Sequence, residues 1–348
     1  MRALTTIPLK ADTLAVTDVP DPTARDGDLL VDGIAVGICG TDREISAGEY
    51  GWAPPGSDRL VLGHESLGWV REAPDGSDFT PGDLVVGVVR RPDPEPCGAC
   101  ARGEFDMCRN GDYTERGIKE IDGYASEQWT VEADYAVKLD PGLEDVGMLM
   151  EPTTVVAKAW EQVDRVGARS WFEPTSVLVT GAGPIGLLAA LLGVQRSLEV
   201  HVLDQVRGGL KPKLVHELGA HYHWADIDAV TERVKPDVVI EATGVPHLVF
   251  GAMAGTASYG VVCLTGVSSV GRSLRVDGGE LNRDIVLEND AVVGSVNANL
   301  RHYAQAADAL AAADLAWLER LVTRRVPLDR FEEAFERQDG DVKVVLTL

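Results

Sequence analysis

Short apolar runs separated by turn residues characterise the first 150 residues of the chain. Val, Ile and Leu gather in segments such as Leu29–Val36 and Leu84–Val89, and clusters of Pro, Gly and Asp stand between these segments. Helical periodicity is scarce in this part. The pattern therefore predicts a mostly β domain.

From about Glu151 onward, strand-like and helix-like segments alternate. Strands are predicted over residues 176–180, 199–204, 237–241, 260–266 and 291–296. Helices are predicted over 155–166, 211–219, 303–314 and 315–323. Such alternation is typical of a parallel, doubly wound sheet, so this part is predicted to have an α/β fold. The strand-like tail, 343–348, is expected to return to the first domain.

The change of pattern predicts two domains. We expect a catalytic domain over 1–155 and 300–348, with a nucleotide-binding domain over 156–299 inserted into it. The uncharged stretch 177–194 reaches the lower length limit of a membrane span. Its Gly and Pro residues divide it, however, so a strand, a turn and a helix are the better interpretation.

Composition and charge exclude several classes of partner. Among 348 residues, 55 are acidic and 32 are basic, which gives a formal net charge of −23. That charge repels phosphate backbones and anionic lipids, so neither nucleic acid nor membrane is expected as a partner. The five cysteines are an odd number, and the chain opens without a secretory leader. We therefore expect a cytoplasmic protein with reduced thiols.

A dinucleotide-binding fingerprint follows the strand predicted over 176–180. The motif is G-x-G-x-x-G between a strand and a helix, and its candidate cofactor residues are Gly181, Gly183, Pro184, Ile185 and Gly186. The first glycine allows a tight turn, the second lets backbone N–H groups approach a pyrophosphate, and the third lets the helix pack on the strand.

An acidic residue ends the next predicted strand, where the adenosine ribose is bound in such folds. Asp204 can accept hydrogen bonds from both ribose hydroxyls and would repel a 2′-phosphate. NAD is therefore favoured over NADP as cofactor. Arg207, three residues further on, could turn toward a 2′-phosphate, although a solvated loop charge is the simpler interpretation.

Ligand-type residues for a borderline metal such as Zn²⁺ occur in the β-rich part. A thiolate, an imidazole and carboxylates are supplied by Cys39, Asp42, His64, Glu65 and Glu151. Each has an alternative interpretation as a small buried side chain, a core histidine or an ion-paired acid. Together, upstream of a cofactor fingerprint, they favour a catalytic metal site with an open position for substrate.

The motifs in this order resemble the zinc-dependent medium-chain alcohol dehydrogenase superfamily. The likeness is carried by IAVGICGTDREISAGEY, LVLGHESLGWV, FTPGDLV, the cysteine cluster and GAGPIG. Within that superfamily, ICGTDREI, VRRP, YTERGI, DGYASE, MLMEP and GSVNAN are similar to the glucose dehydrogenases of archaea. The resemblance implies a GroES-like, mostly β catalytic domain and a Rossmann nucleotide-binding domain.

Roles for individual residues follow from this resemblance. It implies a catalytic zinc held by Cys39, His64 and Glu65 or Glu151. Thr41 is implied to contact the sugar, and Glu115 and Asn297 to bind its hydroxyls together with Glu151. Thr41 and Asp42, close to Cys39, are expected to hydrogen-bond substrate or water and to begin a proton exit route. Gly244, Thr265, Val267 and Asn297, in segments that follow later strands, are assigned to the nicotinamide half of the cofactor; the second segment runs to Ser269.

A second cysteine group matches part of the structural zinc lobe of the family. Cys97, Cys100 and Cys108 fit the last three of its four cysteines, and Pro94 stands where the first is expected. Asp93 or Glu95 could complete a tetrahedral site through a carboxylate oxygen. The alternative is an empty lobe with ordinary thiols.

These features predict an enzyme that oxidises an aldose, D-glucose first, to gluconolactone by zinc-assisted hydride transfer to NAD or NADP. A polyol or secondary-alcohol dehydrogenase would use the same chemistry. A nonenzymatic dinucleotide-binding protein is the alternative from another class. A homo-oligomer, dimer or tetramer, is expected because relatives form both and because 291–296 is an apolar strand that can pair with a second copy.

Overall fold

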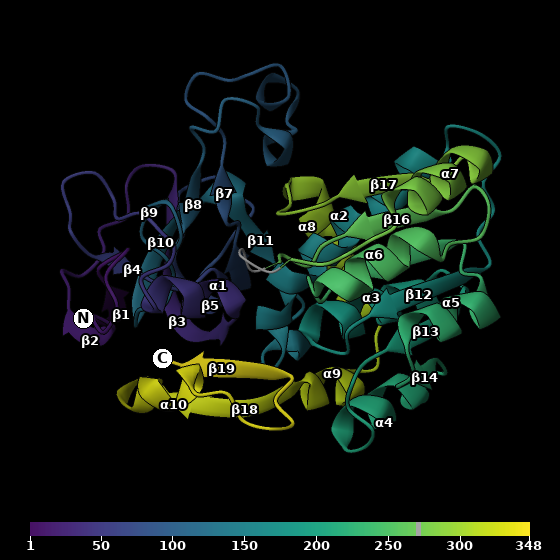
Figure 1. Ribbon diagram of the computed structural model, residues 1–348. Coiled ribbons are helices and arrows are strands. Elements are labelled where there is room, and N and C mark those ends of the chain that lie inside the picture. The colour runs from purple at the N-terminus through teal and green to yellow at the C-terminus, as the bar shows by residue number, and fades with distance from the viewer. Residues whose placement is uncertain (269–272) are drawn as a thin grey trace. The chain divides into compact units, whose positions relative to one another are not determined.

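The computed structural model describes residues 1–268 and 273–348 and divides into two compact units. The first comprises residues 1–154 and 298–348, and the second comprises residues 155–297. Ser269, the predicted end of one nicotinamide segment, lies outside the described residues. Figure 1 shows the elements of both units.

The first unit is mostly β, as the turn-rich pattern predicts. Its central sheet has the order β11-β6-β5-β3-β19-β18, with β10 also paired to β3. The sheet strands are β3 (Asp28–Ile38), β5 (Glu65–Glu72), β6 (Leu84–Gly87), β10 (Gln128–Glu132), β11 (Ala136–Lys138), β18 (Val322–Pro327) and β19 (Lys343–Thr347). The tail strand β19 pairs antiparallel with β3, so the tail does return to this unit.

Two small sheets complete this unit. One is formed by β1 (Arg2–Thr6), β2 (Ala15–Asp18) and β4 (Leu60–Val61), and the other by β7 (Arg90–Arg91), β8 (Thr114–Arg116) and β9 (Glu120–Ile121). Its α-helices are α1 (Gly40–Ser46), α8 (Leu300–Ala311), α9 (Leu315–Leu321), α10 (Phe331–Phe335) and the first turn of α2 (Met150–Gly167). Its short 3₁₀ helices are Cys100–Arg102, Phe105–Met107, Ala133–Tyr135, Pro141–Leu143, Gly147–Leu149 and Leu328–Arg330.

The second unit is a parallel sheet in the order β14-β13-β12-β15-β16-β17. The strands are β12 (Ser176–Thr180), β13 (Glu199–Leu203), β14 (His221–His223), β15 (Val238–Glu241), β16 (Val261–Leu264) and β17 (Ala291–Gly294). The helices are α3 (Pro184–Gln195), α4 (Leu210–Glu217), α5 (Ile227–Val234), α6 (Pro246–Ala254), α7 (Gly278–Glu288) and the rest of α2.

Burial on both faces explains why β12 lies at the centre of this sheet. All five of its residues are buried, and Val177 lies opposite Val200 of β13 and Val238 of β15. β-branched side chains of this kind suit a strand covered on both faces. The strand order reverses at β12, so its carboxyl end is the switch point at which such sheets bind ligands.

Candidate active site

Cys39, His64 and Glu65 converge at the ends of two paired strands. Cys39 follows β3, Glu65 begins β5, and the register pairs Gly37 with Glu65. Cys39 Sγ lies 3.1 Å from His64 Nε2. One ligand atom from each of the three residues lies within 4.8 Å of the other two.

Asp42 contacts two members of this cluster. Cys39 is the N-cap of α1 and accepts a hydrogen bond from the Thr41 N–H at 3.2 Å. The Asp42 Oδ2 atom accepts from the Cys39 N–H at 2.9 Å, and its Oδ1 atom lies 3.4 Å from His64 Nδ1. Asp42 is fully buried (0% exposed), so its carboxylate faces protein atoms. This differs from the expected contact of Asp42 with substrate or water.

The donor set fits a zinc ion. A sulfur, an imidazole nitrogen and a carboxylate oxygen converge, and a carboxylate stands behind the imidazole as in zinc sites where a carboxylate orients the histidine. His64 Nδ1 and Asp42 Oδ1 have no hydrogen-bond partner among the described residues. Burial opposes a charged imidazole, but the negative charges of Cys39 and Asp42 hold the pKa of His64 well above its ordinary value. The surroundings of His64 therefore stabilise a positive charge.

Lys343 neutralises Glu65. Its ammonium, in β19, contacts both oxygens of the Glu65 carboxylate, and each residue is 2% exposed. Gly37 makes room for this pair, since a Cβ there would lie 1.9 Å from Glu65 Oε2. Lys343 could not be identified as a site residue from the sequence, because no local motif marks it.

Glu151 lies near the cluster without joining its closest group. It is the second residue of α2, and the ligand atoms that meet within 4.8 Å are those of Cys39, His64 and Glu65. Burial raises the pKa of Glu151 to about 7, with His64 lowering it and Glu65 raising it further.

Glu115 is paired with an arginine that the sequence analysis did not single out. Its Oε1 atom accepts from Arg90 Nε at 3.1 Å and from Arg90 Nη2 at 2.9 Å. Both residues are buried, and the Arg90 guanidinium lies 3.7 Å from the centroid of the Tyr113 ring. The carboxylate orientation is thus fixed by a planar, charge-assisted pair.

The structure gathers the second cysteine group and brings Asp93 to it. Cys97 Sγ lies 3.7 Å from Cys100 Sγ, and Cys108 Sγ lies 3.9 Å from Asp93 Oδ2. Asp93 is buried, whereas Glu95 is exposed and donates its backbone N–H to Asp93 Oδ1 at 2.8 Å. Of the two carboxylates considered, Asp93 is therefore the one that faces the thiols.

Backbone N–H groups prepare one thiol of this group for a metal. Those of Cys100 and Arg109 lower the pKa of Cys97 to about 6. Burial raises the pKa of Cys100 to about 11. Since a metal ion binds thiolates, a bound cation would bring both to the same charged state.

Gly181 and Gly183 lie in the turn between β12 and α3, and Gly186 lies in the first turn of α3. Gly181 has a φ of +92°, at which the backbone of a residue with a side chain would be strained. A Cβ on Gly186 would lie 1.8 Å from Gly181 O. Nothing lies within 4 Å of a Cβ built on Gly183, the N-cap of α3. A ligand can therefore approach the backbone there, with Pro184 and Ile185 opening the helix behind it.

Asp204 is held beside this turn and paired with a lysine. It accepts from the Ala182 N–H at 2.7 Å and from the Val206 N–H at 3.0 Å. Lys211 Nζ, on α4, lies 3.6 Å from Asp204 Oδ2. The carboxylate charge is thus partly offset, and a lysine seven residues after the acid was the signal missed. Arg207 is exposed and lies 4.6 Å from the centroid of the Trp224 ring.

Glu241 organises the turn that carries Gly244. This carboxylate is fully buried at the end of β15 and accepts from Thr180 Oγ1 at 3.0 Å and from the Gly244 N–H at 3.1 Å. Gly244 has a φ of +65°, and a Cβ there would lie 2.4 Å from Val267 O. Thr265 Oγ1 donates to Glu241 O at 2.8 Å, and Val267 is 82% exposed. These loops share one edge of the parallel sheet.

Asn297 has a left-handed backbone, with a φ of +62°. The preceding residue is held by a buried lysine of α2, because Lys158 Nζ donates to Val296 O at 2.8 Å. An asparagine tolerates this conformation better than most residues do. Its position is therefore fixed by the backbone on its N-terminal side.

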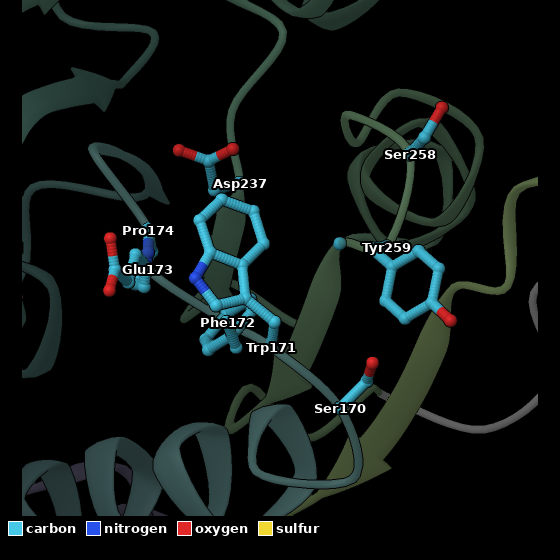
Figure 2. A pocket seen from close by; sticks show the side chains of 9 residues that line it. Ser170, Trp171, Phe172, Glu173, Pro174, Asp237, Ser258 and Tyr259 are labelled. Carbon is cyan, nitrogen blue, oxygen red and sulfur yellow. The ribbon is translucent and has the colours of Figure 1, made fainter.

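A hollow of about 380 Å³ lies at the other edge of this sheet, where the strands begin. Figure 2 shows Trp171, Asp237 and Tyr259 around it. Asp237 Oδ2 accepts from the backbone N–H groups of Thr175 at 2.7 Å and Ser176 at 3.0 Å. Because β12 starts at Ser176 and the fingerprint follows its other end, this hollow is separate from the predicted cofactor site.

Within the described residues, no helix is both long and apolar enough to cross a bilayer. The uncharged stretch 177–194 forms β12, a turn and α3, as its glycines indicate.

A β unit with a thiolate–imidazole–carboxylate cluster, in one chain with a Rossmann sheet, defines a medium-chain, zinc-type dehydrogenase. A family model described as "Alcohol dehydrogenase GroES-like domain" matches residues 25–141, and one described as "Glucose dehydrogenase C-terminus" matches residues 144–348. The chain therefore belongs to the glucose dehydrogenase family of the zinc-dependent medium-chain alcohol dehydrogenases.

Individual relatives match over the whole length. The chain is 40% identical to a glucose 1-dehydrogenase of Methanocella arvoryzae, with 100% of this chain and 99% of the relative covered. It is 42% identical to one of Thermoproteus tenax, with 99% of each covered. The structure of Haloferax mediterranei glucose dehydrogenase in complex with NADP, Zn and gluconolactone has a TM-score of 0.92 and 34% identity, covering 100% of this chain and 99% of that one.

Proposed function

We propose that this chain is a zinc-dependent oxidoreductase that oxidises an aldose, with D-glucose as the leading substrate, to its lactone while NAD⁺ or NADP⁺ is reduced. The observation that carries the proposal is the convergence of Cys39, His64 and Glu65 within 4.8 Å. A 34% identical glucose dehydrogenase has been solved with NADP, Zn and gluconolactone. The full-length likeness supports the same substrate class here.

Cys39, His64 and Glu65 would hold the zinc, with Glu151 as the alternative carboxylate. When bound, this ion would lower the pKa of a sugar hydroxyl, and the nicotinamide would accept a hydride from the carbon that bears this hydroxyl. Asp42 keeps the imidazole turned so that Nε2 faces the Cys39 sulfur. The protein thereby holds the ligands before any substrate arrives.

Glu115, Thr41, Asn297 and Glu151 are the proposed sugar contacts. The Arg90 pair holds the Glu115 carboxylate as a fixed acceptor, which suits recognition of a hydroxyl. A sugar that lacks the hydroxyl facing Glu115 would lose one charge-assisted hydrogen bond and would therefore bind more weakly.

The open backbone at Gly183 and the positive end of α3 are proposed to bind the pyrophosphate. Asp204 would bind the adenosine ribose, and Lys211 would offset its charge enough for NADP⁺ to be accepted as well. Gly244, Thr265, Val267 and Asn297 would flank the nicotinamide half.

A second zinc ion is proposed at Cys97, Cys100, Cys108 and Asp93, where it would stabilise the lobe without taking part in chemistry. A homo-oligomer paired through the edge strand β17 and a cytoplasmic location complete the proposal.

The test is a substrate panel on zinc-replete enzyme with both cofactors. We expect glucose to be oxidised faster than sorbitol or secondary alcohols, with lactone and reduced cofactor formed in equal amounts. Cys39→Ser should lose one zinc per chain and at least about a thousandfold in kcat/KM, because several kcal/mol of charge stabilisation disappear. Dominance of a polyol or secondary alcohol would identify the related dehydrogenase class instead. No turnover by either the wild-type protein or Cys39→Ser would instead indicate a nonenzymatic dinucleotide-binding protein.

A further inference from the structure

Arg90 joins Glu115 to the cysteine lobe. The two residues lie directly opposite each other where β7 pairs with β8. Two of the guanidinium nitrogens, Nε and Nη2, donate to Glu115 Oε1. The third, Nη1, donates to Asp106 O at 3.2 Å. A single planar group therefore connects a proposed sugar contact with the 3₁₀ turn Phe105–Met107.

That turn belongs to the lobe, since Cys108 follows it directly. Its other contacts are with the remainder of the first unit. Asn299 Nδ2 donates to Asp106 Oδ1 at 2.5 Å, and Phe105 packs edge-on against Tyr135 at 6.2 Å between ring centroids. Asn299 is 1% exposed and caps α8 by accepting from the Arg301 N–H at 3.1 Å. The turn is thus held on one side by the unit and on the other by Cys108.

Three thiols and a carboxylate meet at the free side of this turn. Once charged, these groups repel one another unless a cation lies between them. Loss of a bound metal would remove the anchor of Cys108, and a resulting shift of the Asp106 carbonyl would cost Arg90 one of its acceptors. Because the guanidinium is rigid, that movement passes to the Glu115 carboxylate.

Resting on the proposed function, we propose that metal bound by Cys97, Cys100, Cys108 and Asp93 positions Glu115 through Asp106 and Arg90, and so sets the affinity for the sugar. Arg90 is a positioning residue that need not touch the substrate. Loss of the lobe metal then weakens sugar binding while the catalytic zinc and the cofactor site stay intact.

The test compares Cys108→Ser, Arg90→Lys and the double variant. Cys108→Ser should lose one zinc per chain and raise both the KM for glucose and its calorimetric dissociation constant about tenfold, the loss of one hydrogen bond to a charged group. The kcat should change less than about threefold, and the KM for the cofactor should not change. Arg90→Lys should raise the KM for glucose similarly with both zinc ions retained.

The double variant decides whether the effect passes through Arg90. If it does, adding Cys108→Ser to Arg90→Lys raises the KM little further, because the link is already broken. Multiplied effects, or an unchanged KM in zinc-depleted Cys108→Ser, would overturn the inference while leaving glucose oxidation in place. Arg102→Ala, an exposed change in the same lobe, is the matched control and should keep both zinc ions and the KM.

Should Cys108→Ser fail to fold, Arg90→Lys and hydrogen exchange keep the inference testable. Removal of the lobe zinc from the wild-type enzyme by a chelator should speed amide exchange in β8, where Glu115 lies, and exchange unchanged there would contradict the proposed link. Failure of every form to oxidise any aldose would instead contradict the proposed function.

Discussion

Lys343 and Glu65 form a buried ion pair beside His64, although 278 residues separate them in the sequence. The register of three strands brings them together, since Val344 lies opposite Ile38 and Gly37 lies opposite Glu65. The last strand of the chain therefore supplies the cation that balances a proposed zinc ligand.

Lys343→Met should destabilise the metal-free protein by about 3–5 kcal/mol, because it leaves the Glu65 carboxylate buried without a partner. The measurement is urea unfolding of chelator-treated protein. Lys343→Arg keeps the charge and should lose much less. Equal midpoints for the Met variant and the wild type would show that the pair contributes nothing.

Gly37→Ala should disturb the same pair. A Cβ at Gly37 would meet Glu65 Oε2 at 1.9 Å and Lys343 Cε at 2.7 Å, so both side chains must move. Crowding of this kind costs about 1–3 kcal/mol. Gly40→Ala is a matched stability control, since nothing lies within 4 Å of a Cβ there. Similar thermal unfolding of the two variants would refute the crowding argument.

Asp42→Asn should weaken zinc binding about 10- to 100-fold, because it removes the charge that orients His64. Competition with a chromogenic chelator measures the zinc dissociation constant. The variant keeps the size of the side chain, so its urea midpoint serves as the folding control. An unchanged dissociation constant would mean that Cys39 and His64 need no such support.

Local pattern predicts the strands and the fingerprint of this protein well. The strand over 176–180 is found at β12 (Ser176–Thr180), because a β-branched run and a glycine-rich turn define it within a few residues. The helix α1 (Gly40–Ser46) was missed, since it is seven residues long and its N-cap is Cys39 rather than Ser, Thr, Asp or Asn.

The partners of the site residues could not be read in the same way. Lys343 reaches Glu65 only through strand pairing, and Arg90 reaches Glu115 through a two-residue strand. Asp42 was expected at the substrate, and the fold buries it behind His64 instead. Candidate ligand residues can be read from local sequence motifs. The groups that orient them depend on how distant strands pair, which the motifs do not reveal.

Lys211→Met should select against NADP⁺. Lys211 Nζ lies 3.6 Å from Asp204 Oδ2, and without it a 2′-phosphate would face an unbalanced carboxylate. The KM for NADP⁺ should rise about tenfold, as for loss of one charge-assisted contact, and the KM for NAD⁺ should change less. Lys213→Met, exposed on the same helix, is the control. Equal changes for both cofactors would contradict a role for Lys211 at the 2′ position.

A hydrogen-bonded row of histidines, which includes His201 and His223, lies in the parallel sheet and should make the protein acid-sensitive. Arg233 donates to His223 Nδ1 at 2.8 Å, so His223 Nε2 carries the proton and donates to His201 Nδ1 at 2.9 Å. His201 Nε2 lies 3.2 Å from Glu199, and His221 stacks on His201 at 4.9 Å between ring centroids. His223 is thus built into the fold, whereas His221 stays exposed.

Burial, with the charges of His201 and Arg233, lowers the pKa of His223 to about 4. An unfolded histidine binds its proton near pH 6.5, so between about pH 6.5 and 4 the unfolded state holds more protons than the folded state. The free energy of unfolding must therefore fall as the pH falls through this window, by at most about 1.4 kcal/mol per pH unit and less where solvent screens the ring. His223→Gln should flatten that slope in urea titrations. His247→Gln, which lies outside the hydrogen-bonded histidine row, should keep it. Parallel slopes for the two variants would show that acid sensitivity arises elsewhere.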